Sequence, residues 1–293
     1  MNLRVLGVAV AFALFPARAM AYTCTPVPNS SPALSQVWQQ RCIPYWLNPN
    51  SAMMQRSDIQ QIVSQSFAVW SSNECTDLEF MDAGETDQLA GFDPDRCDNK
   101  NVIGAVENDD DLADFFDSPD LLAVTLTSFS RATGEIFDAD ILFNTVNFPF
   151  DDVTAAGLCQ ARNPRPYDIR NTLVHEIGHF IGFDHVNVEG ATMFPSAVNC
   201  ETEKRTLEPD DLDAVCTTYP KDAPANTCAP PADYEAGGDP SIFRDQCINS
   251  DVELCEDRAG NTCSCGTTGG RGGLWGLLIV LPLFLRRRAR LQR

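Results

Sequence analysis

Apolar side chains recur at helical spacing in two long segments of the chain. The first segment runs from Ser57 to about Ser71, and the second runs from Asp168 to Ile181. The apolar positions of the first segment are Ile59, Ile62, Val63, Phe67 and Trp70. A helix turns once in about 3.6 residues, so this spacing places them on one face. Both segments are therefore predicted to be helices packed on a core.

Short apolar runs between turn residues predict strands. These runs cover residues 78–81, 102–106, 121–129 and 135–144, and the last of them follows a turn at Gly134. Irregular chain follows the second long helix, and a short helix is predicted near Pro209 to Thr217. One helix, several strands and another helix are typical of an α+β domain, which we assign to residues 22–220.

The N-terminal residues 1–21 have the three parts of a secretory signal peptide. Arg4 provides a basic start, an apolar run follows from Val5 to Phe15, and small residues stand at Ala19 and Ala21. The apolar run is shorter than the roughly 20 residues that cross a bilayer as a helix. We therefore expect cleavage, export and a mature chain that begins near Tyr22.

Residues 221–265 differ from the main body in composition. Their first part, Lys221 to Pro231, is rich in proline, which is typical of a linker. The rest contains four cysteines and few large apolar side chains, so it needs disulfides to hold a fold. We predict a linker and a small Cys-rich stalk, that is, a disulfide-rich C-terminal segment.

Residues 266–293 form a second targeting feature. A glycine-rich stretch precedes an apolar run from Leu274 to Leu285, and an arginine cluster follows it. The run is too short for an ordinary membrane span, although the arginines behind it favour a cytoplasmic end. The segment resembles the tripartite C-terminal sorting signals of bacterial surface proteins, in the myxobacterial version with Cys263 and Cys265 just before it. A simple transmembrane anchor is the alternative, and both predict attachment to the cell envelope.

Charge and cysteine content narrow the environment further. The formal net charge of −20 makes nucleic acid and anionic lipid unlikely partners and favours divalent cations. Twelve cysteines in an exported chain predict disulfides. Sequence spacing suggests pairing within local loops, although sequence alone leaves the connectivity open. The pairs expected from spacing are Cys75–Cys97, Cys200–Cys216 and Cys228–Cys247.

The second long helix carries the motif H-E-x-x-H at His175, Glu176 and His179. Two histidines four residues apart lie on one face of a helix and can bind one metal ion. A continuing helix cannot bring His185 to the same ion, so the chain must turn sharply, and Gly182 permits that turn. The complete pattern is H-E-x-x-H-x-x-G-x-x-H.

The histidine content of the chain supports a metal site. The sequence contains three histidines, and all three occupy ligand positions of this motif. Three imidazoles leave one tetrahedral position of Zn²⁺ open for water, as in catalytic zinc sites. The carboxylate of Glu176 is then placed to act as a general base on that water, whose pKa zinc lowers to about 7. The interpretation that Glu176 is an ordinary surface carboxylate is weaker, because it directly follows the first ligand.

The extended motif resembles that of the metzincin metallopeptidases, which add a methionine in a tight turn beneath the zinc. Met193 stands eight residues after His185 in Ala-Thr-Met-Phe-Pro, and this short gap is similar to that of the matrixins. Further similarity to bacterial matrixin-like chains extends over about residues 37–220. It includes Phe67 to Trp70, Asp138 to Ile141, and Arg205 to Leu207 with the pair Asp210 and Asp211.

This resemblance implies a metzincin, zincin-like fold. Its catalytic domain has a twisted, mostly parallel five-stranded sheet and two long helices, with a cleft between upper and lower subdomains. The resemblance also implies that the strand near Ile136 to Asn144 is an edge strand that pairs with an extended peptide substrate. Met193 and Gly182 then support the site without binding the metal.

Some positions depart from the matrixin pattern. Vertebrate matrixins bind a structural zinc through further histidines, and this chain has none to spare. Val186 stands where matrixins usually carry serine or threonine, so pappalysin-like enzymes are a neighbouring possibility. The segment Gln40 to Pro44 resembles a cysteine switch only faintly, and for Cys42 a disulfide is the better interpretation in an exported chain.

Calcium is a second candidate cofactor. The stretch from Glu107 to Asp120 is rich in carboxylates that could bind Ca²⁺, although it lacks the spacing of an EF-hand and a solvated acidic loop is commoner. Asp138 and Asp140 are similar candidates. Asp184 could steady the turn between Gly182 and His185 through a hydrogen bond, or face water.

The sequence therefore predicts a secreted or surface-attached zinc endopeptidase that cleaves protein or peptide substrates outside the cell, in an extracellular matrix or at the outer membrane. The alternative is a catalytically silent zinc-binding adhesion protein on the same fold, and a third possibility is a peptidase that processes only its own chain. Retention of Glu176 favours catalysis. Substrate specificity depends on the loop after Met193, roughly Pro195 to Lys204, and it stays open, as does the oligomeric state.

Overall fold

The computed structural model describes residues 22–30, 33–49, 56–91, 100–154 and 157–222. The predicted signal peptide 1–21, the predicted stalk and the sorting signal 266–293 lie outside the described residues, as do Cys97, Cys228 and Cys247. Of the linker, only Lys221 and Asp222 are described. Among the helices of this described part, none combines the length and apolar character of a membrane span.

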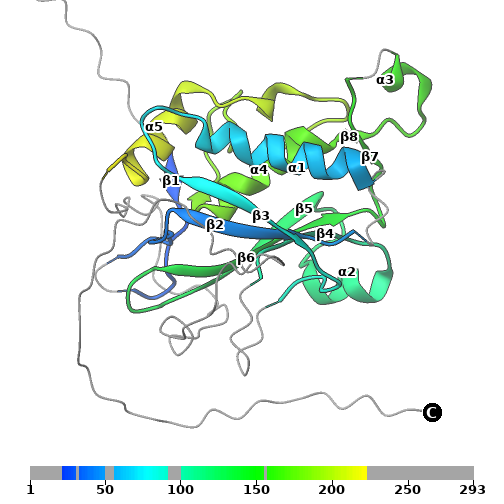
Figure 1. Cartoon of the computed structure of the whole chain (residues 1–293). Helices are drawn as coiled ribbons and strands as arrows, with labels where there is room; N and C mark the ends of the chain where they lie inside the picture. Colours follow the sequence, from blue (N-terminus) through cyan, green and yellow to red (C-terminus); the bar gives the residue numbers. More distant parts are fainter. Residues whose placement is uncertain (1–21, 31–32, 50–55, 92–99, 155–156, 223–293) are drawn as a thin grey trace, which may run out of the picture. The chain divides into compact units, whose positions relative to one another are not determined.

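A mixed sheet of five strands forms the centre of the fold (Figure 1). Four of its strands run parallel, and the fifth lies antiparallel at one edge. In spatial order they are β3 (Glu79–Glu85), β2 (Cys42–Leu47), β4 (Val102–Val106), β6 (Ile136–Asn144) and β5 (Ala123–Phe129). Every residue of β4 and β6 is buried, as expected for inner strands covered on both faces. The expectation that the strand near Ile136 to Asn144 is a substrate-pairing edge is therefore wrong, because β6 is paired with β4 and β5 on its two sides and the edge strand is β5.

The predicted strands correspond to β3, β4, β5 and β6, but β2 was missed. Its sequence, Cys-Ile-Pro-Tyr-Trp-Leu, lacks apolar and polar alternation and contains Pro44, which argues against a strand. The strand forms because Ile43, Tyr45 and Leu47 are buried in the core. Burial of these side chains outweighs the weak local signal.

The two long predicted helices are α1 (Arg56–Ser71) and α4 (Ile169–Phe180), which pack against each other on one side of the sheet (Figure 1). Trp70 of α1 fixes their contact, because its indole N–H donates a 2.9 Å hydrogen bond to the carbonyl oxygen of Val174. Between helices and sheet, the Phe67 ring stacks on Tyr45 at 4.3 Å and meets Phe180 edge-on at 5.4 Å. These contacts hold α4 firmly over the sheet.

Smaller elements complete the domain. Among them, α5 confirms the short helix predicted near Pro209 to Thr217. Helix α2 lies within the acidic stretch considered for calcium. The helical ones are α2 (Asp109–Phe115), α3 (Leu158–Ala161), the 3-10 helix η1 (Glu203–Arg205) and α5 (Pro209–Thr218). The short strands pair as β1 (Thr23–Cys24) with β9 (Phe183–Asp184), and as β7 (Phe150–Asp151) with β8 (Tyr167–Asp168).

The acidity of α2 has a local explanation. The Asn108 side chain caps the helix by accepting a hydrogen bond from the backbone N–H of Asp111 at 2.9 Å. The three aspartates that follow Asn108 occupy the first turn of the helix, where negative charge interacts favourably with the helix dipole. Calcium binding in this stretch stays a prediction.

Two disulfides correct the pairings expected from sequence spacing. Cys75 bonds to Cys216 and Cys159 bonds to Cys200, so the expected pairs Cys75–Cys97 and Cys200–Cys216 are wrong. Sequence spacing fails as a guide because distant cysteines meet through tertiary packing. Here the N–H of Lys221, which follows α5, donates a 2.9 Å hydrogen bond to the carbonyl of Cys75, which follows α1, so these two parts of the chain lie together. Cys42 is also disulfide-bonded, which confirms the disulfide interpretation of this residue.

Candidate metal centre

Helix α4 positions the first two histidines. It begins after Asp168, whose carboxylate accepts a 2.7 Å hydrogen bond from the N–H of Asn171 and so caps the first turn. His175 and His179 then lie one turn apart. Nine of the twelve helix residues are buried, which leaves little freedom for the helix to shift.

A sharp turn after α4 brings in the third histidine, as predicted from Gly182. This glycine has a φ of +89°, and a Cβ on it would lie 2.2 Å from the carbonyl oxygen of Gln36. The turn is held by β1 and the residue after it, because the hydroxyl of Thr23 donates to His185 O at 3.1 Å and the N–H of Thr25 donates to Gly182 O at 2.9 Å. Asp184 also steadies it by accepting a 2.7 Å bond from the His185 N–H.

The three histidine side chains converge on one point. The Nε2 atom of His185 lies 3.2 Å from that of His175 and 3.1 Å from that of His179. One ligand atom from each of the three lies within 4.8 Å of the others. The structure therefore brings together the predicted ligand set.

Outer hydrogen bonds and burial prepare these imidazoles for a metal. Nδ1 of His175 lies 2.6 Å from Thr192 O, and Nδ1 of His179 lies 2.7 Å from Phe183 O. A carbonyl accepts only, so each Nδ1 carries the proton and each Nε2 keeps its lone pair for the centre. Burial lowers the pKa of all three rings, that of His185 to about 4, so they are neutral at pH 7. Three neutral imidazoles suit zinc.

Glu176 lies beside this cluster and is buried. One carboxylate oxygen accepts a 2.6 Å hydrogen bond from the hydroxyl of Thr125 on β5. Burial raises the pKa of Glu176 to about 7, although the Thr125 hydrogen bond opposes that rise. A carboxyl group with this pKa can both accept and release a proton near neutrality.

Met193 lies in the turn beneath the histidines. Val186 donates its N–H to the carbonyl of Met193 at 3.0 Å, and Met193 is almost fully buried. Its sulfur touches α4 at Gly178, where a Cβ would come within 2.2 Å. Asp211 anchors the same turn by accepting a 2.9 Å bond from the Thr192 N–H.

Asp140, one of the residues considered for calcium binding, binds backbone N–H groups of neighbouring segments. Its carboxylate accepts hydrogen bonds from the N–H groups of Val102 at 2.8 Å and Gly91 at 2.7 Å. Asp138 is buried in the same strand, and the structure does not bring either residue to the histidine cluster. The two hydrogen bonds explain the burial of Asp140, and calcium binding at Asp138 and Asp140 stays a prediction.

A cleft of about 500 Å³ opens on the cluster. The three histidines, Glu176 and Thr125 line it, together with Lys204 and part of the loop that follows Met193. Sequence reasoning missed Thr125 and Gly178, and it named Lys204 only as the end of the loop after Met193. A glycine inside an otherwise helical pattern is a signal that could have indicated Gly178, whereas Thr125 and Lys204 carry no local signal.

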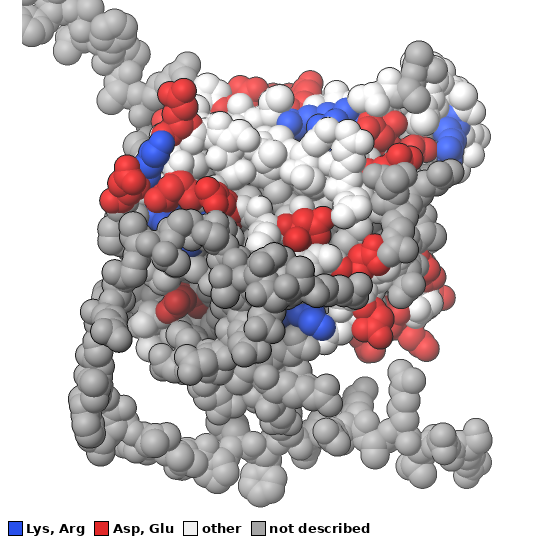
Figure 2. Space-filling model, in the orientation of Figure 1, with Lys and Arg blue, Asp and Glu red and all other residues white. Residues whose placement is uncertain are grey.

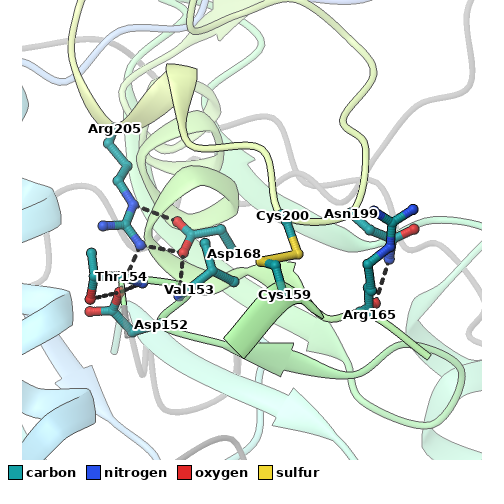
Figure 3. Close-up of a disulfide and its surroundings, with 9 residues drawn as sticks. All are labelled: Asp152, Val153, Thr154, Cys159, Arg165, Asp168, Asn199, Cys200 and Arg205. Carbon is teal, nitrogen blue, oxygen red and sulfur yellow. Dashed lines mark hydrogen bonds and ion pairs between the residues drawn. A yellow bond between two sulfur atoms is a disulfide. The ribbon is translucent and has the colours of Figure 1, made fainter. Parts of the chain in front are cut away.

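The loop after Met193 is fixed to the body of the domain (Figure 3). The Cys159–Cys200 disulfide ties it to α3, and the Asn199 side chain donates a 2.6 Å hydrogen bond to the Arg165 carbonyl. Next to the loop, the Arg205 guanidinium binds Asp168, the residue that caps α4. The loop after Met193, which forms one wall of the cleft, is thus joined to α4, the helix that carries His175 and His179.

Comparison with known proteins relates the chain to a family and to a human protein. The family model of the matrixins matches residues 37–220. Neutrophil collagenase of Homo sapiens is 22% identical over 185 residues, which cover 62% of this chain and 33% of that protein. The chain thus matches about a third of that relative's length.

Proposed function

The chain belongs to the matrixin family, and from this premise we propose that it is a zinc-dependent endopeptidase that hydrolyses peptide bonds in proteins outside the cell. The observation that carries the proposal is the convergence of three imidazole Nε2 atoms beside a buried carboxylate in one cleft. His175, His179 and His185 would hold the metal. When bound, Zn²⁺ supplies a Lewis acid that polarises the scissile carbonyl and lowers the pKa of a coordinated water to about 7.

The protein groups around the cluster supply proton transfer. Glu176 takes a proton from the attacking water and then delivers it to the leaving amine, a role that suits its raised pKa of about 7. Thr125 orients the carboxylate, because its 2.6 Å hydrogen bond fixes one of the two oxygens. The carbonyls of Thr192 and Phe183 hold the two helix histidines in the tautomer that binds metal.

The cellular setting is proposed from the termini of the sequence. A signal peptide at residues 1–21 and a C-terminal sorting signal at 266–293 would place the enzyme at the cell surface, the outer membrane or outside the cell. The acidic surface, part of which Figure 2 displays in red, fits an exported protein and does not fit a nucleic-acid partner.

The test compares the full mature chain with its Glu176→Ala variant. Metal content is measured by mass spectrometry, and cleavage is measured with unfolded casein before and after chelation. An exposed-carboxylate substitution, Glu74→Ala, is the matched control. One zinc in all three proteins, with cleavage lost in Glu176→Ala and in chelator, supports the proposal. A wild type without zinc overturns it, whereas zinc without cleavage by the wild type favours a zinc-binding protein.

A further inference from the structure

Lys204 is a buried lysine in the wall of the cleft. It lies in η1, is 4% exposed, and is the single lysine or arginine among the described residues that line the cleft. Lysine is almost never fully buried unless its charge is paired, because removing an ammonium from water costs several kcal/mol. Its position beside the histidine cluster therefore calls for an explanation.

The partners of Lys204 leave part of its donor capacity unused. Its ammonium donates a hydrogen bond to the carbonyl of Ser196 and lies 3.4 Å from the carboxylate of Glu201. Within the described chain these two are the contacts found for Nζ. An ammonium has three N–H donors, so one is available to a group that enters the cleft. The missing partner would be a hydrogen-bond acceptor.

The loop that carries these groups is held in place before any substrate arrives. Cys200 is bonded to Cys159, and its N–H donates a 3.0 Å hydrogen bond to Pro166 O. The backbone N–H of Lys204 donates a 2.8 Å hydrogen bond to the side chain of Asn171 on α4. Because the wall is fixed, the ammonium does not need to be ordered on binding, which favours affinity.

Charge elsewhere in the cleft is of the opposite sign. Asp120 and Asp184 also line it, and both are acidic. A negative substrate side chain is therefore disfavoured near these two carboxylates and favoured near Lys204. The cleft can sort charged side chains by position along the bound peptide.

We propose that Lys204 is a specificity-determining residue that binds a carboxylate side chain of the substrate, glutamate above all, in the part of the cleft lined by Ser196 and Lys204. The carboxylate accepts a charge-assisted hydrogen bond from the remaining N–H of Lys204. Glu201 holds the ammonium in place and moderates its charge. The proposal rests on the peptidase function proposed above and names its substrate class.

The first measurement profiles cleavage of a proteome-derived peptide library by the full zinc-loaded chain. We expect glutamate to be enriched at least fivefold at one position near the scissile bond. In Lys204→Met, which keeps the length of the buried stem, this enrichment is expected to disappear. Exposed Lys221→Met is the matched control and is expected to keep it. In Glu201→Gln, which removes the competing carboxylate, the enrichment is expected to increase.

A binding measurement separates this inference from the proposed function. Fluorescent octapeptides of alanine and glycine with one central Glu or Leu are titrated into Glu176→Ala and into Glu176→Ala/Lys204→Met. If Glu176→Ala binds the Glu peptide at least tenfold more tightly than the Leu peptide, and Glu176→Ala/Lys204→Met does not, the inference is supported. This holds even if the wild type cleaves neither casein nor peptides, a result that overturns only the proposed peptidase function. Equal binding of both peptides, or a wild-type cleavage profile without acidic preference, overturns the role of Lys204.

Discussion

A Cβ atom on Gly178 would lie 2.2 Å from the sulfur of Met193. The helix that carries His175 and His179 therefore rests directly on the methionine turn, with no space for one more methyl group. The same Cβ would lie 3.1 Å from the Trp70 ring of α1. This contact therefore sets the distance between α4 and the turn that contains Met193.

The first prediction tests that contact with Gly178→Ala. In an exposed helix this change stabilises by about 1 kcal/mol, but here overpacking is expected to outweigh it and to destabilise the protein by about 1–2 kcal/mol, with weaker zinc binding. Urea unfolding and a zinc titration measure both effects. Met193→Ala in the same chain removes the obstructing sulfur, so the double variant is expected to cost less than the sum of the single changes. A Gly178→Ala protein as stable as the wild type would mean that Met193 moves aside freely.

The second prediction concerns the hydrogen bond from Thr125 to Glu176. Thr125→Val keeps the shape of the side chain and removes the donor, so we expect kcat to fall about tenfold, the equivalent of about 1.4 kcal/mol, with KM changed less than about twofold. Thr125→Ser is expected to restore most of the rate. Thr127→Val, two residues along the same strand, is the control, since Thr127 donates to Gln36 instead. A fall in stability equal for both valine variants, with no specific loss of kcat, would contradict the positioning role.

Sequence reasoning was most successful where chemistry and periodicity coincide. The ligand helix, the turn at Gly182 and the methionine turn lie in one continuous stretch, so local spacing predicts their meeting. The strands β4, β5 and β6 were found because they are apolar runs between turn residues. In contrast, β2 contains a proline and lacks alternation, and only its burial in the core explains it.

The rest of the site depends on contacts between distant parts of the chain. Thr125 precedes Glu176 by 51 residues, and Lys204 meets Asn171 across 33 residues, so neither contact leaves a pattern in the sequence. The disulfides failed for the same reason, since Cys75 and Cys216 are 141 residues apart. Such contacts follow from packing of the sheet and helices, which local propensity does not encode.

The third prediction addresses the disulfide behind the cleft wall. Cys159 and Cys200 close a loop with a sequence separation of 41, and loss of such a link is expected to cost about 3 kcal/mol of stability. Replacing both cysteines by alanine should also make the loop around Lys204 more mobile and so reduce the preference for glutamate in the peptide library. Replacing Cys75 and Cys216 by alanine is the control, because it removes a disulfide whose residues do not line the cleft. Loss of acidic preference in both double variants would indicate general destabilisation instead.

The fourth prediction uses the pH dependence of the ion pair between Asp152 and Arg205. Partial burial by itself raises the pKa of Asp152, but hydrogen bonds from Thr154 and Arg205 outweigh burial, so its pKa lies below the usual value. The unfolded chain titrates this group near about 3.9. The stability that the charged form provides is therefore fully present above about pH 4 and is lost as pH falls through the lower, folded value.

Asp152→Asn is accordingly expected to reduce the free energy of unfolding by about 1 kcal/mol at pH 6, since the 2.7 Å contact joins a charged pair that is only partly exposed. At pH 2 to 3 the difference from the wild type is expected to shrink, because the wild-type carboxylate is then also becoming neutral. Urea unfolding between pH 2 and 7 measures this, with a substitution at exposed Asp114 as the control for removing a carboxylate. A difference that stays constant with pH would show that Asp152 stabilises through packing and not through its charge. Because Arg205 also binds the cap of α4, Asp152→Asn is expected to bind zinc more weakly than the wild type in a zinc titration at pH 6, where the His185 ring is neutral.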